Sequence, residues 1–488
     1  MATKRPLIEI SAPFAGQLSN EFEQSSVGGQ LLQQCDITTD GILKAAEAIA
    51  ADFTLSTSVI ATDFEYFDDG SGNNLELYAI AGVRIYRKRN GSWSSIRTNG
   101  QTVTANSFQS LKAFDFAAAA TTKRILYYTS DGKLGGYYYD GASEQFNDSL
   151  STFANADTKA HPMETKGGYL YIGDGNKIAR LEPLGAAFDD DALVMTKEYR
   201  ALCIKTYNDR LCIGTYRGTA ITDVAECRLI TWQGIAGVEE EESLSLGERG
   251  ITAMEVYQSY LWIFAGVKGH IYKFNGATIS PAEFEIPNVS RQVYVKPNAV
   301  AVIDNKLLFG LSDDNADANE TALQGIYQIF KKKPGYPFSL SFPYIESDNG
   351  TLLIQVGAIE GNVAGTAFHF SRYNNTNYKI DISSTNRATL ATAPEFHTQK
   401  YLVAIGDAGT VINSFEILAK LLPSGTSVRI DYKQDNAAAW TTNSYTFTST
   451  NQNSKQAVGL KNCKILQLKV VLITSSGSTP EIYKILVW

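Results

Sequence analysis

The sequence predicts an all-β protein, and three observations support that prediction. A strand-turn-strand pattern recurs along most of the chain, many of its turns contain Asn or Asp followed by Gly, and its apolar runs are too short for ordinary helices. The pattern is clearest in residues 251–276, where two apolar strands flank a polar turn at 257–259 and an aromatic third strand follows. Each copy therefore predicts a small antiparallel meander.

Seven copies of this pattern follow one another. Their central strands begin at Glu76, Ile125, Tyr169, Leu211, Tyr260, Leu307 and Leu352. Intervals of 42 to 49 residues, each containing several short strands, are typical of β-propeller blades, because one four-stranded sheet cannot bury both of its apolar faces alone. We therefore predict a seven-bladed β-propeller.

The repeat occupies only part of the 488 residues. Residues 1–55 are expected to form an N-terminal arm and lead-in, in which residues 42–53 are either a short helix or a strand-loop segment. The propeller is expected over residues 56–398. Longer alternating strands in residues 399–488 predict a C-terminal antiparallel β-sandwich, and its apolar last strand is expected to be docked rather than free.

Composition and charge argue against several classes of protein. The net charge of −8 argues against a general nucleic-acid binder, no apolar run is long enough for a membrane helix, and the first residues lack the apolar core of a secretory signal. The cysteines are Cys35, Cys203, Cys212, Cys227 and Cys463. Their odd number and wide spacing favour buried free thiols over a disulfide, which fits a reducing cytoplasm.

Local motifs for catalysis or metal binding are missing. The histidines are His161, His270, His369 and His397, and none of their spacings suits a metal site. No nucleophile elbow, phosphate-binding loop or dinucleotide fingerprint occurs. Residues 129–136 resemble part of a sialidase Asp-box without its Trp, and an ordinary hairpin turn is favoured. We therefore assign no catalytic, cofactor-binding or metal-binding residue, and we expect no cofactor.

Two polar segments could hold a hard cation. The first has oxygen ligands at alternate positions, namely Asp313, Asn315, Asp317 and Asn319. Calcium loops of the EF-hand type also need a Gly and a bidentate Glu, which Ala318 and Gln324 replace here, so a solvated loop is favoured. The second, weaker segment contains Asp68, Asp69, Asn73 and Asn74.

Charged and aromatic runs allow two interpretations each. Glu239–Glu242 is most simply a solvated rim loop, with a docking surface for a basic partner as the functional alternative. Lys331–Lys333 either protects a strand edge or contacts a polyanion. Tyr137–Tyr139 is expected to pack in a core, with a sugar-stacking platform as the alternative. The copies show no acidic residue at a common position, which argues against a glycosidase, since that chemistry needs two carboxyl groups about 5–10 Å apart.

The repeat and the closing module together resemble one protein family. The closing module contains VRIDYKQDNAAAW (428–440) and the strands of residues 460–488, and the opening residues 6–20 resemble a leading arm. This layout is similar to the β-propeller virion proteins of tailed bacteriophages, notably tail nozzle or stabilisation proteins. The resemblance implies a structural component of the virion, made in the host bacterial cytoplasm, that is not an enzyme.

The same resemblance implies assembly as a homo-oligomeric ring with portal-adaptor or other tail components. Tail nozzle, tail tip and a related attachment apparatus all remain open as locations. The runner-up hypothesis is a propeller that binds a host-surface glycan through aromatic side chains, and a glycosidase ranks third. The assembly hypothesis predicts a defined oligomer, whereas a glycan-binding protein should bind sugars as a monomer.

Overall fold

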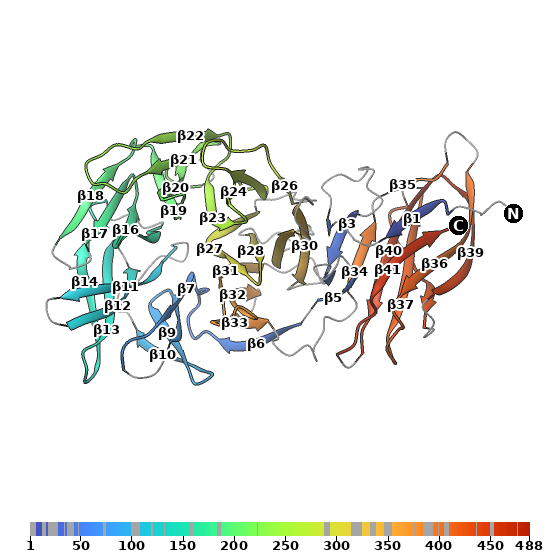
Figure 1. Ribbon diagram of the computed structural model, residues 1–488, viewed down its shortest axis with the longest axis horizontal. Coiled ribbons are helices and arrows are strands. Elements are labelled where there is room, and N and C mark those ends of the chain that lie inside the picture. The colour runs from blue at the N-terminus through green and yellow to red at the C-terminus, as the bar shows by residue number, and fades with distance from the viewer. Residues whose placement is uncertain are drawn as a thin grey trace. The chain divides into compact units, whose positions relative to one another are not determined.

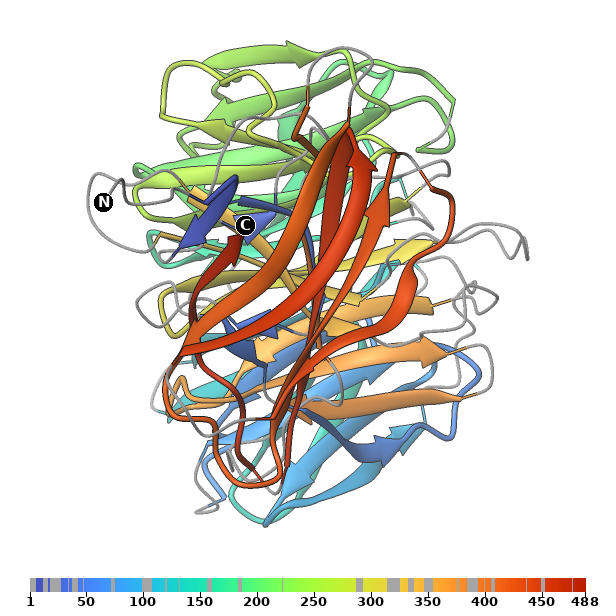
Figure 2. The same cartoon turned by 90° about the vertical axis from the view of Figure 1, so that its right-hand side faces the viewer.

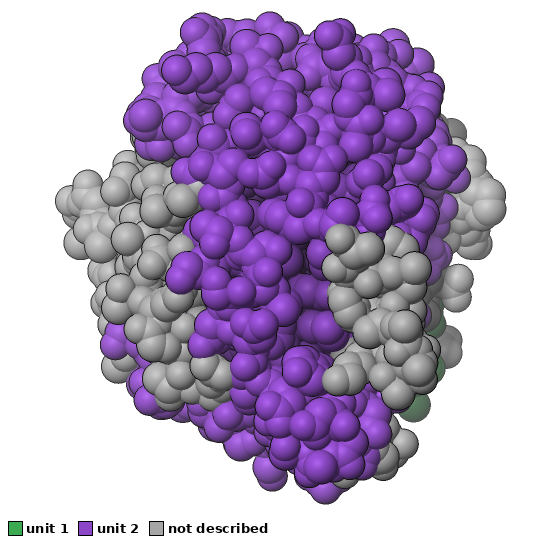
Figure 3. Space-filling model, turned by 90° about the vertical axis from the view of Figure 1, so that its left-hand side faces the viewer, with its two compact units in different colours: residues 1–50, 326–345, 383–488 green, residues 51–325, 346–382 purple. Residues whose placement is uncertain are grey.

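The computed structural model divides into two compact units (Figures 1 and 3). Unit 1 comprises residues 1–50, 326–345 and 383–488, and unit 2 comprises residues 51–325 and 346–382. The structure describes residues 6–11, 16–17, 28–33, 35–36, 43–46, 48–71, 75–98, 108–118, 121–130, 132–155, 160–182, 187–221, 223–286, 293–313, 325–331, 338–345, 354–374, 377–383, 394–398, 400–404, 409–435, 437–448, 453–475 and 477–488. Within these residues all regular structure is β-structure, which confirms the predicted class, and no helix could span a membrane.

Unit 2 consists largely of four-stranded antiparallel sheets, each made of consecutive strands. The first contains β7 (Asp63–Phe67), β8 (Glu76–Ala81), β9 (Arg84–Arg89) and β10 (Ser92–Thr98), and the second contains β11 (Leu111–Ala118), β12 (Thr121–Ser130), β13 (Lys133–Tyr139) and β14 (Glu144–Thr152). The next contain β15 (Met163–Lys166), β16 (Tyr169–Asp174), β17 (Lys177–Leu181) and β18 (Phe188–Val194), then β19 (Tyr199–Tyr207), β20 (Arg210–Arg217), β21 (Cys227–Trp232) and β22 (Glu242–Leu246), then β23 (Ile251–Tyr257), β24 (Tyr260–Ala265), β25 (His270–Phe274) and β26 (Phe284–Glu285). Further along the chain, β27 (Val293–Ile303) pairs with β28 (Lys306–Asp313).

The last sheet of unit 2 is closed by a strand from the beginning of the chain. It has the order β31 (Ile354–Gly361), β32 (Phe368–Asn374), β33 (Tyr378–Ser383) and β6 (Ile49–Thr54). The Leu55 N–H donates to the Tyr378 carbonyl at 2.8 Å just beyond β6. A sequence pattern cannot reveal this pairing, because the two strands are separated by most of the repeats.

The first strand of each sheet in unit 2 contacts the first strand of the next. Contacts join β7 to β11, β11 to β15, β15 to β19, β19 to β23, β23 to β27, β27 to β31, and β31 back to β7. The set therefore closes on itself. We refer to these strands as the first strands. In Figure 1 their labels lie toward the middle of the blue to yellow part of the ribbon.

Tyrosines at the ends of two first strands hold the hairpin of the following sheet. The Tyr207 hydroxyl donates to the Ser259 carbonyl and the Tyr257 hydroxyl to the Asn305 carbonyl, both at 2.8 Å. Each receiving hairpin has two residues with positive φ and no glycine, and φ is 49–66° across Gln258, Ser259, Asp304 and Asn305. Because left-handed backbone is unfavourable for such residues, a bond that fixes the hairpin stabilises the junction between sheets.

Unit 1 contains two larger sheets and a small one. One has the order β1 (Ile8–Ser11), β41 (Ile482–Val487), β36 (Thr410–Ala419) and β39 (Asn453–Cys463). The other runs through β29 (Gly325–Lys331), β30 (Phe338–Ile345), β3 (Gly28–Gln33), β34 (Glu395–Thr398), β40 (Ile465–Ile473), β37 (Ser427–Gln434) and β38 (Thr441–Phe447), with β2 (Gly16–Gln17) beside β3 and β35 (Tyr401–Leu402) beside β40. The small sheet pairs β4 (Cys35–Asp36) with β5 (Lys44–Ala45).

Both larger sheets of unit 1 contribute to one hydrophobic core. Phe415 and Ile485 come from the first sheet, and Ile430 and Leu468 come from the second. Figure 2 looks onto the long orange and red strands that carry these side chains. The C-terminal strand β41 lies between β1 and β36, and Ile485 and Val487 are fully buried. The expectation that the last strand is docked is therefore confirmed.

Several sequence expectations can now be corrected or confirmed. The helix alternative for residues 42–53 is wrong, because β5 and β6 lie there. The seventh copy was placed one strand out of phase: Ile354–Gly361 is the first strand of its sheet rather than the central one. All five cysteines are buried free thiols, as predicted, and burial raises the pKa of Cys212 and Cys227 to about 12.

We predict that Tyr257→Phe lowers the free energy of unfolding by about 1 kcal/mol, the usual net contribution of one such hydrogen bond. The Tyr257 ring is buried, and the substitution keeps the ring while removing the hydroxyl that donates to the Asn305 carbonyl. Urea denaturation of both proteins measures the difference. Tyr139→Phe is the matched control, because no hydrogen bond of the half-buried Tyr139 occurs among the described residues, and equal losses in the two variants would contradict the prediction.

Candidate functional site

Six ionisable side chains come together on the first strands of unit 2. They are Glu65 on β7, Lys112 on β11, Glu164 on β15, Lys205 on β19, Glu255 on β23 and Glu360 on β31, and we call them the first-strand charged cluster. Each is paired across its hairpin with a residue of the second strand. Those partners are Tyr78, Tyr127, Tyr171, Cys212, Trp262 and His369.

Four of these charged residues occupy equivalent positions in their hairpins. Glu65, Glu164, Lys205 and Glu255 each lie two residues before the last paired residue of the first strand. Ala301 occupies the equivalent place on β27. The expectation that the copies share no acidic residue at a common position is therefore wrong.

Sequence reasoning missed the cluster because the copies were aligned on their second strands. The hairpins that begin with β7, β11 and β31 differ in length from those of the other copies. The number of residues between the charged residue and its partner on the second strand therefore differs as well. A usable signal exists in three consecutive copies, where Glu164, Lys205 and Glu255 precede their cross-strand partners by the same spacing.

Two ion pairs anchor the cluster. The Lys205 ammonium lies 2.7 Å from a carboxylate oxygen of Glu255, and the Lys112 ammonium lies 3.6 Å from one of Glu65. Glu65 also accepts the Ala113 N–H at 3.1 Å, and Glu255 accepts the Val256 N–H at 3.0 Å. These bonds fix the carboxylates against the first strands.

The cluster is partly open to solvent. Side-chain exposure is 20% for Glu65, 28% for Lys112, 30% for Lys205 and 16% for Glu255. The charged groups can therefore be reached by a small polar ligand.

The charges of the cluster do not balance. Its four glutamates face two lysines, and Ala301 supplies no charge at the position between Glu255 and Glu360. Burial and, second to it, the nearby charge of Glu65 raise the pKa of Glu360 to about 7, while Lys112 and Lys205 oppose the shift. Burial raises the pKa of Glu65 as well, against the attraction of Lys112. Glu360 therefore takes up and releases its proton near neutral pH.

The neighbouring carboxylates raise the pKa of both lysines of the cluster. Burial alone would lower the pKa of Lys112, but Glu65, Glu164, Asp63 and Glu360 raise it overall. The same balance, with Glu255 and Glu164, raises the pKa of Lys205. Both lysines therefore stay charged over the whole range in which Glu360 titrates.

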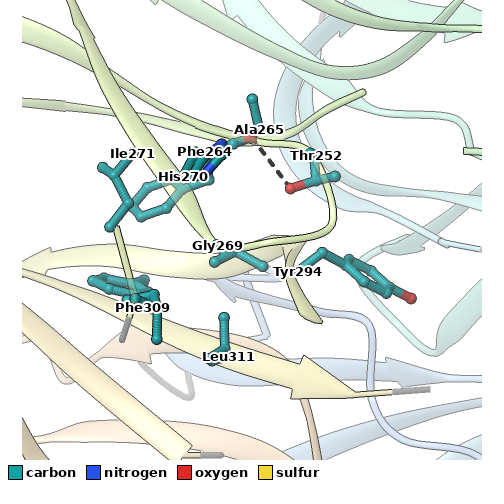
Figure 4. A pocket seen from close by; sticks show the side chains of 12 residues that line it. Thr252, Phe264, Ala265, Gly269, His270, Ile271, Tyr294, Phe309 and Leu311 are labelled. Carbon is teal, nitrogen blue, oxygen red and sulfur yellow. Dashed lines mark hydrogen bonds between the residues drawn. The ribbon is translucent and has the colours of Figure 1, made fainter. Parts of the chain in front are cut away.

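A small apolar pocket lies elsewhere in unit 2. It lies between the β23–β25 strands and β27 and β28, is lined by Phe264, Ile271, Tyr294 and Phe309 among others, and has no room for a whole water molecule (Figure 4). The Thr252 hydroxyl at its edge is bonded to the Phe264 carbonyl at 3.2 Å. Ligand pockets usually enclose about 300–1,000 Å³, so this space is a packing gap between sheets rather than a binding site.

The polar segments that the sequence singled out have structural partners where they are described. Asp69 is buried and accepts the Tyr137 hydroxyl at 3.0 Å, and Asp68 accepts the Gly70 N–H at 3.0 Å. Tyr137 is fully buried, so the core interpretation holds for that residue. Glu241 pairs with Arg210 at 2.9 Å, and the Lys331 ammonium lies 5.1 Å from the Phe338 ring centre.

Other residues that the sequence analysis singled out lie outside the described residues. These are Asn73, Asn74, Asn315, Asp317, Asn319, Lys332, Lys333 and the side chain of Asp313. Docking surfaces at Glu239–Glu242 and Lys331–Lys333 stay predictions.

Each histidine has its own partner. His161 lies 2.9 Å from the Gly173 carbonyl oxygen. His270 lies 2.5 Å from a carboxylate oxygen of Glu248, and His397 lies 2.8 Å from one of Glu395. His369 contacts Lys88 at 3.0 Å. In the described part of the chain, the one grouping of potential metal ligands is the acidic run Asp189–Asp191 on β18, and exposed acidic runs are common without an ion.

Comparisons with known proteins bear on the fold alone. No protein-family profile and no curated protein matches the chain. Similar solved structures include the extracellular domain of a hybrid two-component system from B. thetaiotaomicron, with 11% identity, a TM-score of 0.45 and coverage of 80% of this chain and 43% of that one. The WD40 β-propeller domain of Doa1 has 9% identity, a TM-score of 0.40 and coverage of 70% and 98%. An exo-β-1,3-galactanase from Phanerochaete chrysosporium has 9% identity, a TM-score of 0.32 and coverage of 91% and 100%.

One expectation is overturned by these comparisons. We expected a protein that is not an enzyme, and that expectation is wrong, because the structures similar to this chain include the galactanase and a glycoside hydrolase. The likeness concerns the fold, and it assigns no activity to this chain.

We predict that Glu360→Gln stabilises the protein at about pH 8, by roughly 1–3 kcal/mol, and has little effect at about pH 5. The pKa of Glu360 is about 7 in the folded protein against 4.5 when unperturbed. The folded state therefore binds more protons between these values, and stability falls as pH rises through them. Urea denaturation at both pH values tests this.

Glu255→Gln is the matched control for that experiment. It removes the carboxylate that pairs with Lys205 at 2.7 Å and leaves a half-buried ammonium without its closest partner. We expect it to destabilise the protein by about 1–2 kcal/mol at the higher pH. The electrostatic account of the cluster fails if the two variants change stability in the same direction at about pH 8.

Proposed function

We propose that unit 2 is a seven-bladed β-propeller and that the two larger sheets of unit 1 form the C-terminal β-sandwich. The closed series of contacts among the first strands supports the propeller, and the strand β6, which completes the last sheet, supports closure of a ring. The common core of the two larger sheets supports the sandwich.

We further propose that the propeller binds a glycan at the first-strand charged cluster. The observation that carries this proposal is the cluster itself: charged residues of both signs stand at a common position and remain partly exposed. Ligand sites combine an enclosed location with a few fixed polar groups. Carboxylates that accept and ammonium groups that donate hydrogen bonds suit a ligand rich in hydroxyl groups.

The residues of the cluster would have different roles. Lys205 and Glu255 form a fixed donor and acceptor pair for neighbouring hydroxyls, as do Lys112 and Glu65. Glu360 is the carboxyl that holds a proton near pH 7 and can donate a hydrogen bond, or the proton itself, to a bound oxygen. Binding and cleavage of a glycan are both compatible with this arrangement, and an assay has to separate them.

We predict that the protein binds a subset of glycans on an array and that Lys205→Met combined with Glu255→Gln weakens binding at least about tenfold. Removing both partners keeps the net charge of the cluster and avoids an unpaired charge. The control removes the exposed pair Lys420 and Glu481 of unit 1 in the same way and should bind normally. Release of reducing ends from a bound glycan would identify an enzyme.

The glycan proposal fails if the folded wild-type protein binds no glycan on the array. It also fails if the double variant in the cluster binds as tightly as the control.

A second candidate function is assembly into the virion of a tailed bacteriophage, as part of a tail nozzle, tail tip or related apparatus. The observation that favours it lies in unit 1. Among the described strands, β1 and β39 are the outermost members of their sheet, and outer strands can pair with another chain. Apolar side chains on or beside this sheet are also 38–58% exposed, namely Leu7, Val411, Leu421 and Tyr483.

We expect the purified protein to form a discrete oligomer in light scattering if this second proposal is right. Val411→Asp combined with Leu421→Asp should shift the mass toward the monomer, because charges oppose burial of these exposed positions. Val363→Asp is a control, since Val363 is exposed on unit 2. A monomeric wild-type protein that also fails to copurify with virions would contradict the proposal.

A further inference from the structure

Side chains from opposite sheets of unit 2 meet where the first strands begin. Phe108 precedes β11, and its ring centre lies 5.6 Å from the ammonium group of Lys296 on β27. In the closed series of contacts, β15, β19 and β23 separate β11 from β27 on one side, and β7 and β31 separate them on the other. The contact between Phe108 and Lys296 therefore spans the central space that the first strands surround, which we call the channel.

Phe108 also packs against the sheets that begin with β15 and β19. Its ring lies against a small apolar core made of Ala160, Leu202 and Tyr216. Leu202 belongs to β19, which is not a neighbour of β11 in the closed series. The backbone of Phe108 forms a parallel bridge with Ala160, which precedes β15. The segments that lead into β11 and β15 therefore run in the same direction along the channel.

A second contact across the channel skips a sheet on the other side. The Asn298 amide on β27 donates to the Thr62 carbonyl, just before β7, at 3.0 Å. The strand β31 lies between β27 and β7, and a Cβ atom added to its Gly357 would lie 2.1 Å from the Ala61 carbonyl oxygen. The Thr62 hydroxyl donates to the Gln109 carbonyl at 2.9 Å. The first strands thus approach one another closely at this end.

These contacts close one end of the channel. We call the set of Thr62, Phe108, Leu202, Lys296 and Asn298 the plug. Thr62, Leu202 and Lys296 are buried. A lysine that has lost most of its water gains more from an aromatic face than an exposed one does, so Lys296 and Phe108 hold each other in place. A ligand cannot pass this end without displacing the plug.

Accessibility increases along the first strands away from the plug. Leu202 is 1% exposed, whereas Lys205, further along β19, has 30% of its side chain exposed. Thr252 on β23 is likewise 1% exposed, and Glu255 further along has 16% of its side chain exposed. A strand rises about 3.3 Å per residue, so the charged cluster lies about 10 Å from the plug along the channel. Solvent therefore reaches the cluster from the end where the first strands turn into their hairpins.

We propose that the first-strand charged cluster lies in a blind-ended channel and receives the non-reducing end of a glycan chain. This inference rests on the proposed glycan-binding function and adds the class of ligand to it. A chain that enters from the hairpin end meets the plug about 10 Å beyond the cluster, so its interior cannot extend past the cluster on both sides. Glycans attached to a surface through their reducing end have the other end free to enter.

A glycan array tests this inference, because its oligosaccharides are attached through their reducing ends. The probes are each oligosaccharide that binds and the same oligosaccharide extended by one different sugar on its terminal residue. We expect the extension to weaken binding at least about tenfold, because the plug stops the longer chain before its former terminal residue reaches the cluster.

A plug variant shows whether the plug causes this difference. Phe108→Ala combined with Leu202→Ala makes room beyond the cluster, so the difference between parent and extended oligosaccharides should fall to about threefold or less. Leu150→Ala combined with Phe188→Ala is the matched control. These residues lie on β14 and β18, the last strands of their sheets, and the control should keep the wild-type difference.

The outcomes separate this inference from the function on which it rests. If the folded protein binds no glycan, the proposed function fails and the inference fails with it. Equal binding of parent and extended oligosaccharides by the wild type overturns the inference alone and leaves the glycan proposal standing. An undiminished difference in the folded plug variant overturns it as well. Should the plug variant not fold, the wild-type comparison still decides.

Discussion

The structure of unit 2 depends on how its first strands meet. Seven strands that contact one another in a closed series bring residues at equivalent positions close together, whatever their distance along the chain. A charged residue at such a position must be neutralised by its neighbours, because like charges at short range in a half-buried space are unfavourable. The cluster follows this rule from β7 to β23, where Glu, Lys, Glu, Lys and Glu alternate.

The alternation breaks at β27, and the electrostatic features of the site follow from that break. Ala301 takes the place where a cation would continue the pattern, so Glu360 has no cation on that side and meets Glu65 on the other. Burial first, and the charge of Glu65 second, raise the pKa of Glu360 to about 7. A cluster held together by ion pairs thus keeps one acidic group that is available to a ligand. The residues that stabilise the cluster are also those that we propose bind the ligand.

Much of the fold could be predicted from the sequence, because its signals are local. Alternating apolar residues and turns such as Asn90-Gly91, with φ of 50° and 80°, identify strands and hairpins without knowledge of the rest of the chain. The buried cysteines and the docked last strand follow from similar reasoning. The hairpin at Gln258-Ser259 has the same left-handed geometry without the glycine, and a tyrosine of the preceding sheet supports it.

The candidate site could not be predicted in the same way. Glu65 and Glu360 are brought together only by closure of the series, and the 3.7 Å approach of Asp52 to His369 depends on β6, which joins its sheet from the other end of unit 2. The phase error in the seventh copy hid Glu360 further, because Ile354–Gly361 was aligned with second strands. Spacing along the chain contains no direct information about such contacts.

Disulfide trapping would test the closed series most directly. In the variant with Glu65→Cys and Glu360→Cys, mild oxidation should cross-link β7 to β31 and change the mobility of the denatured, unreduced chain, while the native cysteines stay buried. In the variant with Glu65→Cys and Glu255→Cys, the strands are not neighbours and no cross-link should form. Failure of the first pair to cross-link, or equal cross-linking of both pairs, would contradict the arrangement on which the charged cluster depends.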